Sequence, residues 1–239
     1  MTSSNTPETF PIAIEGGHVT ARHYAATPPP VATLVFAHGA GSSQSHPAIT
    51  TFMHALAECG IEGVTFDFPY REQGRKIPDR APVLEQCYAA VIAQVRERLA
   101  SARDQLFIGG RSMGGRMATQ LAAQDAQLPI AGLVLLGYPL HPPGQPSKRR
   151  DAHLPQVGRP MLIVQGSRDT FGTPDEMRPV FEPLAPLATL HIVEGADHSL
   201  VVSRTASKQA PVNDAIRRVV VDWMTAITRA DAATRPPQR

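Results

Sequence analysis

The stretch Gly110-Arg111-Ser112-Met113-Gly114 is a G-x-S-x-G pattern that lies between a short apolar run and a segment favouring helix. The apolar run covers Gln105 to Gly109, and the helix-favouring segment covers Gly115 to Ala123. This context predicts a buried strand, a sharp turn and a helix, with the Ser112 side chain exposed on the turn. Glycines suit such a bend because they tolerate unusual backbone angles and let neighbouring backbone pass. We interpret the turn as a nucleophile elbow; an ordinary glycine-rich turn is the alternative.

Length and composition indicate one globular domain. The chain has 239 residues, of which 42% are hydrophobic and 18% charged, and its net charge of +2 gives no reason to expect nucleic-acid binding. We expect a core over residues 10–228 and flexible ends at residues 1–9 and 229–239. The two cysteines, Cys59 and Cys87, form neither a disulfide framework nor a metal motif. With no signal peptide and no apolar run of membrane-spanning length, we expect a soluble cytoplasmic protein without membrane contact.

Short apolar strands alternate with amphipathic helices along most of the chain. A hairpin turning at Gly16-Gly17 is expected first, from strands Phe10 to Glu15 and His18 to Ala25. Further expected strands are Ala32 to Ala37, Gly63 to Phe68, Ala131 to Gly137, Pro160 to Gly166 and Thr189 to Glu194. Expected helices outside the elbow are His46 to Cys59, Pro82 to Ala100, Pro174 to Leu184 and Pro211 to Thr228. This alternation predicts an α/β fold with a mostly parallel sheet covered by helices on both faces.

Loops that follow the parallel strands are the expected positions for chemistry. The first is His38-Gly39-Ala40-Gly41, whose small residues let backbone N–H groups face a cavity. We predict that the amides of Ala40 and Met113 form an oxyanion hole. The alternatives are a plain glycine-rich connector or a phosphate cradle, although the chain has no phosphate-loop motif. We expect His38 to brace this loop rather than to ionise in catalysis.

Two later loops supply an acid and a base. Asp169 follows the strand ending at Gly166, and His198 follows the strand ending at Glu194. A turn or cap role is the alternative for Asp169, and Asp197 is a rival acid, although an immediate neighbour of the base rarely reaches its far ring nitrogen. The order Ser112, Asp169, His198 is that of α/β-hydrolases. We therefore predict a serine hydrolase in which His198 activates Ser112, Asp169 orients His198, and water clears an acyl-enzyme.

Several stretches resemble a narrower family of small α/β-hydrolases related to dienelactone hydrolases, the KANL3/Tex30 group named after testis-expressed and chromatin-complex proteins. They are His38 to Gly41, Gly110 to Arg116, Tyr138 to Gly144, His153 to Pro155, Gln165 to Thr173 and Gly195 to His198. The resemblance spans about Val31 to Thr228 and implies an α/β-hydrolase fold with the same triad positions. Dienelactone hydrolases carry cysteine at the elbow, so their lactone substrate is not transferred to Ser112. Some eukaryotic relatives are subunits of chromatin-modifying assemblies, so a scaffold that binds a protein partner is the alternative function.

The segment where many lipases insert a lid, Tyr138 to Arg159, is short, proline-rich and polar. We therefore expect little or no lid, an open site, and a small or water-soluble ester or thioester as the acyl substrate. Arg71 and Arg75 follow one strand and are candidate ligands for an anionic group; Lys148, Arg149 and Arg150 add charge in the short segment. The alternative is that these are solvated loop charges. No metal or organic cofactor is expected, and the choice between monomer and homodimer stays open.

Overall fold

A computed structural model describes residues 6–234. Its strands are β1 (Glu8–Ile14), β2 (Gly17–Tyr24), β3 (Ala32–Ala37), β4 (Ile61–Phe66), β5 (Leu106–Arg111), β6 (Gly132–Leu136), β7 (Met161–Gly166) and β8 (Ala188–Val193). Its helices are α1 (Pro47–Ala57), α2 (Pro69–Glu72), α3 (Ala81–Arg98), α4 (Ala100–Asp104), α5 (Met113–Gln124), α6 (Pro174–Phe181) and α7 (Ala206–Thr234). Two 3₁₀ turns complete the list, η1 (Leu154–Gln156) and η2 (Glu182–Leu184).

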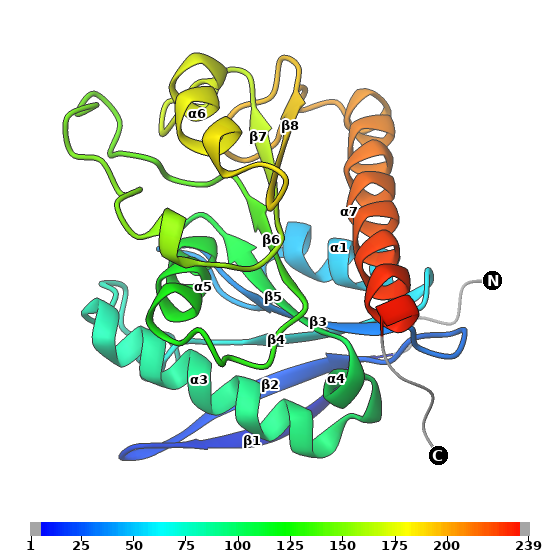
Figure 1. The fold of residues 1–239 in the computed structure, drawn as a ribbon. Coiled ribbons are helices and arrows are strands. Elements are labelled where there is room, and N and C mark those ends of the chain that lie inside the picture. The colour runs from blue at the N-terminus through cyan, green and yellow to red at the C-terminus, as the bar shows by residue number, and fades with distance from the viewer. Residues whose placement is uncertain (1–5, 235–239) are drawn as a thin grey trace.

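The strands form one twisted sheet in the order β1-β2-β4-β3-β5-β6-β7-β8 (Figure 1). The β1–β2 hairpin and the β2–β4 pair are antiparallel, and all pairs from β4 to β8 are parallel. The central strands β3, β5, β6 and β7 are buried almost throughout because helices cover both faces of the sheet there. The predicted α/β fold with a mostly parallel sheet is therefore confirmed.

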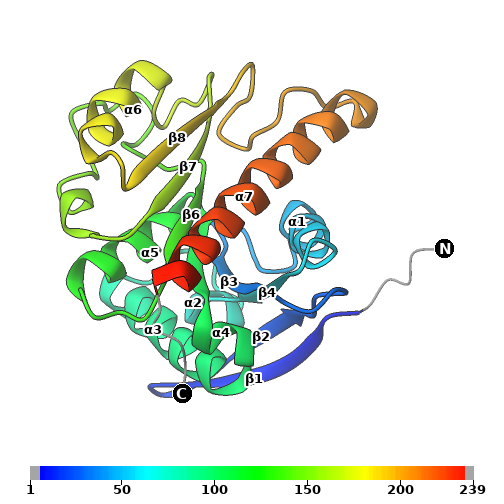
Figure 2. The same ribbon diagram turned by 45° about the vertical axis from the view of Figure 1, so that its right-hand side comes forward.

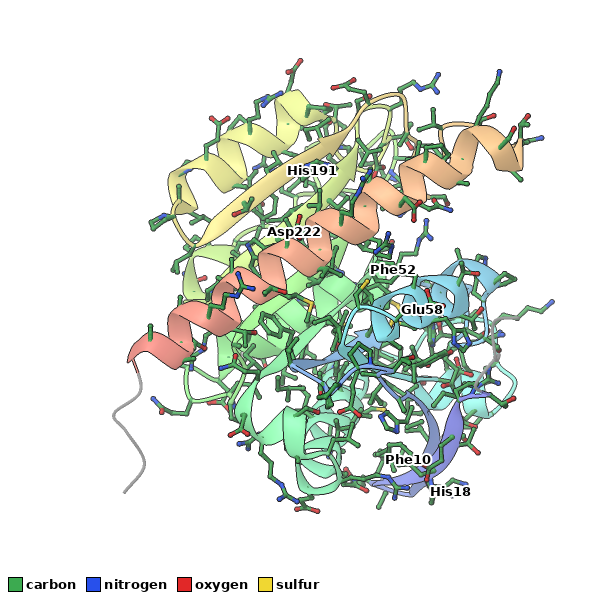
Figure 3. The ribbon with its side chains drawn as sticks, turned by 90° about the vertical axis from the view of Figure 1, so that its right-hand side faces the viewer. Phe10, His18, Phe52, Glu58, His191 and Asp222 are labelled. Atoms are coloured by element: carbon green, nitrogen blue, oxygen red, sulfur yellow. The ribbon has the colours of Figure 1, made fainter. Side chains whose placement is uncertain are left out.

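Side-chain alternation divides the core into two layers. On β3, Val35 belongs to the layer that contains apolar residues of α3, α5 and α6, whereas Leu34 and Phe36 belong to the layer that contains those of α1 and α7. Figure 2 shows α7 running diagonally across its face of the sheet. In Figure 3 the same helix crosses the view, with α1 and its residue Phe52 beside it and His191 on the edge strand β8. The two layers hold the carboxyl ends of the parallel strands in a fixed arrangement.

Most predicted strands and helices agree with the structure within two residues, and the differences have local causes. The helix expected from Pro211 begins at Ala206, because the Gln209 side chain accepts the N–H groups of Val202 and Ser203 and orders the preceding turn. At its other end, α7 continues to Thr234, so the tail expected to fray after residue 228 is helical up to that point. β1 likewise begins at Glu8 rather than Phe10. The remaining expected flexible ends, residues 1–5 and 235–239, lie outside the described residues.

The segment between β6 and β7 contains η1 and otherwise turns and irregular chain, so no helical lid covers this end of the sheet within the described residues. Within residues 6–234 there is also no helix of the length and apolar character needed to cross a membrane.

Tyr88 ties α3 to the strands that lead into the elbow, and its ring is fully buried. Its hydroxyl accepts the N–H of Gly109 at 2.9 Å and lies 2.9 Å from the carbonyl oxygen of Val35. We predict that Tyr88→Phe lowers the free energy of unfolding by about 1–3 kcal/mol, because buried backbone groups lose their partner. Urea unfolding followed by circular dichroism measures this change. Equal stability of the two proteins would show that these hydrogen bonds contribute nothing net.

Candidate active site

The nucleophile turn is held in a strained conformation between β5 and α5. Ser112, the residue before the first turn of α5, has φ 50° and ψ −114°. Positive φ is costly for a residue with a β-carbon and is characteristic of functional turns. The strain lies at Ser112 rather than at the flanking glycines, since neither Gly110 nor Gly114 has a positive φ.

The flanking glycines are needed because the backbone is crowded. A β-carbon on Gly110 would lie 2.5 Å from the carbonyl oxygen of Ala37, and one on Gly114 would lie 2.4 Å from the same atom. The turn therefore packs directly against the carboxyl end of β3.

Ser112, His198 and Asp169 form a continuous hydrogen-bonded chain. The Ser112 Oγ lies 2.9 Å from Nε2 of His198, and Nδ1 of His198 lies 2.8 Å from Oδ2 of Asp169. Because a carboxylate only accepts, Nδ1 carries the proton that His198 donates to Asp169, and Nε2 is free to accept from the Ser112 hydroxyl. The arrangement matches the geometry required for a serine nucleophile and its general base.

The Asp169 carboxylate is fully buried and accepts three hydrogen bonds. Besides His198, its donors are the Gln165 amide at 2.8 Å and the Phe171 N–H at 2.8 Å. Phe171 also stacks on the His198 ring, with 4.0 Å between ring centroids. These contacts fix both the carboxylate and the imidazole plane.

Asp197, the alternative acid in the sequence analysis, stabilises its own loop. Its Oδ1 accepts the N–H groups of Ser199 at 2.8 Å and Val201 at 3.0 Å, which closes the loop that carries His198. The structure thus brings Asp169, not Asp197, to the His198 ring.

The loop after β3 approaches the nucleophile from the other side. Gly39, Ala40, Ser112 and Met113 all line one cavity. As the first residue of α5, Met113 has an N–H without an intrahelical acceptor. Among the described residues the Ala40 and Met113 amides donate no hydrogen bond. This placement is compatible with the predicted oxyanion hole.

His38 braces this loop from below. It is fully buried, its Nδ1 lies 2.8 Å from the carbonyl oxygen of Gly39, and its Nε2 accepts the Phe68 N–H at 3.3 Å. Burial lowers the pKa of His38, against the opposing effects of Gly39 and Asp67. A neutral ring that donates from Nδ1 satisfies both contacts.

A cavity of about 720 Å³ opens beside Ser112 and His198. Three arginines line it: Arg111, Arg116 and Arg150. Burial lowers the pKa of both Arg111 and Arg116. The guanidinium groups at the site therefore come from the elbow, from α5 and from the segment between β6 and β7.

Arg71 and Arg75 are not among the residues that line this cavity. Arg71 belongs to α2, and Arg75 forms an ion pair with Asp79 at 2.7 Å and borders a smaller cavity next to the β1–β2 hairpin. Their role in binding an anionic substrate stays a prediction.

No role is predicted from the sequence for Gln165 or Phe171, and Arg111 and Arg116 enter the prediction only as members of the motif around Ser112. The signal for the arginines was present, because both flank Ser112 closely in the chain. Gln165 gave no signal, since a glutamine inside an apolar strand acquires its role only through contacts that the fold creates.

A model of the alpha/beta hydrolase domain family matches residues 30–227. The chain belongs to this family.

Solved structures show the same fold at low sequence identity. A lidless α/β serine hydrolase from Xanthomonas campestris is 20% identical, with a TM-score of 0.71 over 92% of this chain and 95% of that one. Dienelactone hydrolase from Anabaena variabilis is 18% identical, with a TM-score of 0.72 over 93% and 99% of the two chains. Est1E from Butyrivibrio proteoclasticus, solved with ferulic acid bound, is 15% identical, with a TM-score of 0.71 over 90% and 99%.

We predict that Gly114→Ala destabilises this hydrolase by about 3 kcal/mol or more, because the new methyl group meets backbone that has no room to shift. Thermal unfolding followed by circular dichroism measures the loss. A variant as stable as the parent would contradict the close packing of the elbow on β3.

The lowered pKa of His38 predicts a pH-dependent stability. In the unfolded chain His38 gains a proton as the pH falls through about 6.5, whereas in the folded protein it resists protonation. The unfolded state then binds more protons, so His38 makes the free energy of unfolding fall below that pH. We expect the drop between pH 7 and 5 to be smaller in His38→Gln than in the parent, as measured by urea titrations. An equal drop in both proteins would exclude His38 as a source.

Proposed function

We propose that this protein is a serine hydrolase that cleaves a small or water-soluble carboxylic ester or thioester. The observation that carries the proposal is the hydrogen-bonded chain from Ser112 through His198 to the buried Asp169. Membership in the α/β-hydrolase family supports it, and so does the likeness to proteins described as a serine hydrolase and a dienelactone hydrolase. We infer further that the chain belongs to the KANL3/Tex30 branch, on the motifs quoted above.

In the proposed reaction, Ser112 Oγ attacks the substrate carbonyl while Nε2 of His198 takes the hydroxyl proton. Asp169 holds the ring so that Nε2 faces Ser112, and its charge stabilises the imidazolium that forms. The Ala40 and Met113 amides donate hydrogen bonds to the negative oxygen, a contribution of about 2.7–4 kcal/mol for one donor in a comparable site.

The imidazolium then protonates the leaving alkoxide or thiolate, which departs and leaves an acyl group on Ser112. A water molecule attacks the acyl carbonyl while His198 takes one of its protons. The bond between the acyl carbon and Ser112 Oγ then breaks, the imidazolium returns the proton to Oγ, and the acid leaves. These steps use side chains and backbone amides alone. An acceptor alcohol in place of water would turn hydrolysis into acyl transfer with the same groups.

Substrate size follows from the open cavity. Without a helical lid in the described residues, the site offers no long apolar wall for a fatty acyl chain. Short acyl groups and water-soluble leaving groups fit this site better than triglycerides. Free thiols at Cys59 and Cys87 agree with action in the reducing cytoplasm.

Labelling with a fluorophosphonate probe tests the proposal without a known substrate. We expect rapid modification of Ser112, identified by mass spectrometry of the labelled peptide. Ser112→Ala abolishes it, and His198→Ala slows it by about a hundredfold or more, because proton removal by a positioned base contributes on this scale.

Ser199→Ala is the matched control, since Ser199 lines the same cavity without contacting the triad. This variant should label like the parent. Folded protein that does not label would overturn the hydrolase proposal and favour the scaffold alternative, in which the fold binds a protein partner.

A further inference from the structure

The cavity beside Ser112 carries an excess of positive charge. Arg111, Arg116 and Arg150 line it, and among the described residues the carboxylate that lines it is Asp79. Asp79 is already paired with Arg75 at 2.7 Å. The Asp169 and Asp197 charges act on Arg111 and the Glu85 charge acts on Arg116, but none of the three arginines forms an ion pair within the described residues.

Arg116 and Arg150 line this cavity together, and their charges interact. The Arg150 charge lowers the pKa of Arg116, in addition to the larger effect of burial. Within residues 6–234 neither guanidinium group forms an ion pair, and Nε of Arg116 is buried without a hydrogen-bond acceptor. The carboxylate next to Arg150 in the chain, Asp151, is bound by Arg149. The Glu85 carboxylate offsets part of the Arg116 charge without forming an ion pair with it. Two like charges at a partly buried place still raise the free energy of the site, and a bound anion would lower it.

Both arginines have anchored backbones. Arg116 lies one helical turn after Ser112, and its N–H donates to the Ser112 carbonyl at 3.1 Å. The Arg150 N–H donates to Leu140 at 2.8 Å, and its carbonyl oxygen accepts the buried Tyr138 hydroxyl at 2.6 Å. The bases of both side chains therefore stand at fixed positions relative to the nucleophile. A group bound between them needs little rearrangement of the chain.

We propose that Arg116 and Arg150 bind a carboxylate of the ester substrate, so that this enzyme cleaves carboxylate-bearing esters in preference to neutral esters of the same size. The proposal rests on the serine hydrolase function inferred above. Guanidinium groups suit a carboxylate because their N–H groups form a planar fork that matches its two oxygens. The substrate class is then a half-ester of a dicarboxylic acid, or an ester of a hydroxy acid.

Matched ester pairs test the preference. Mono-p-nitrophenyl succinate is compared with its neutral methyl ester, which places the charge on the acyl side. The second pair, 4-acetoxybenzoate and methyl 4-acetoxybenzoate, places it on the leaving group. In at least one pair we expect kcat/KM to be about ten- to hundredfold higher for the anion, the range expected for hydrogen bonds to a charged group.

Arg116→Gln and Arg150→Gln should each lower the ratio of kcat/KM for the anionic ester to kcat/KM for its neutral partner towards one. Because both esters are measured on the same variant, a general loss of activity cancels in this ratio. Arg116→Lys keeps the positive charge but lacks the planar set of guanidinium N–H groups, so it should retain part of the preference for the anionic ester. Lys148→Gln removes an exposed charge from the same segment outside the cavity and should retain both the parental activity and the parental ratio.

The outcomes separate the two proposals. Hydrolysis of neutral esters with a ratio near one in both pairs would overturn the carboxylate site and leave the hydrolase intact. The preference for anionic esters could persist in Arg116→Gln and Arg150→Gln but disappear in the double variant Arg71→Gln with Arg75→Gln. That result would place the anion site in the segment after β4 and overturn our assignment. Absence of turnover together with absence of labelling at Ser112 would overturn both.

Discussion

The contact between the nucleophile turn and the carboxyl end of β3 is the constraint on which the rest of the site depends. At Gly110 and Gly114 the backbone leaves no space for a β-carbon beside the Ala37 carbonyl. Since the loop with Ala40 begins just after Ala37, the same contact brings that loop against the start of α5. The proposed nucleophile and oxyanion donors are thus positioned by backbone packing, which tolerates far less movement than long side chains would.

A second constraint is the burial of a charge. Asp169 has no exposed surface, and a buried carboxylate without partners would destabilise the fold by several kcal/mol. Its hydrogen bonds offset this cost and tie it to Gln165, whose side chain also accepts the Tyr138 N–H and donates to the Gly172 carbonyl. The network joins the ends of β6 and β7 to the loop that holds Asp169. The exposed Asp197 accepts hydrogen bonds from backbone N–H groups of its own loop instead.

Much of the fold could be predicted because local sequence patterns, such as apolar runs and glycine pairs, determine where strands and turns lie. The apolar run from Ala32 to Ala37 has the bounds of β3, and the glycine pair after Ile14 marks the first hairpin. Ser112, Asp169 and His198 could be placed together because each follows a parallel strand, and such strands end at one edge of the sheet. Helix ends were less predictable where they depend on distant contacts, as the early start of α7 shows.

Contacts between distant segments also explain which parts of the site sequence reasoning left out. Arg71 and Arg150 are equally plausible as loop charges in the sequence, and only the fold shows that Arg150 lines the cavity. The same distinction bears on catalysis. Burial lowers the pKa of Arg111, and the charges of Asp197 and Asp169 oppose this effect, whereas Arg116 and Arg150 repel one another.

Positive charge near the triad helps an oxyanion but opposes the imidazolium that His198 forms in the proposed first step. A carboxylate held by Arg116 and Arg150 would neutralise positive charge that no ion pair balances within the described residues. The field at His198 would then be set mainly by the buried Asp169, which favours the imidazolium. The proposed substrate charge and the proposed general base therefore support each other: a substrate that fills the anion site also removes the electrostatic obstacle to its own cleavage.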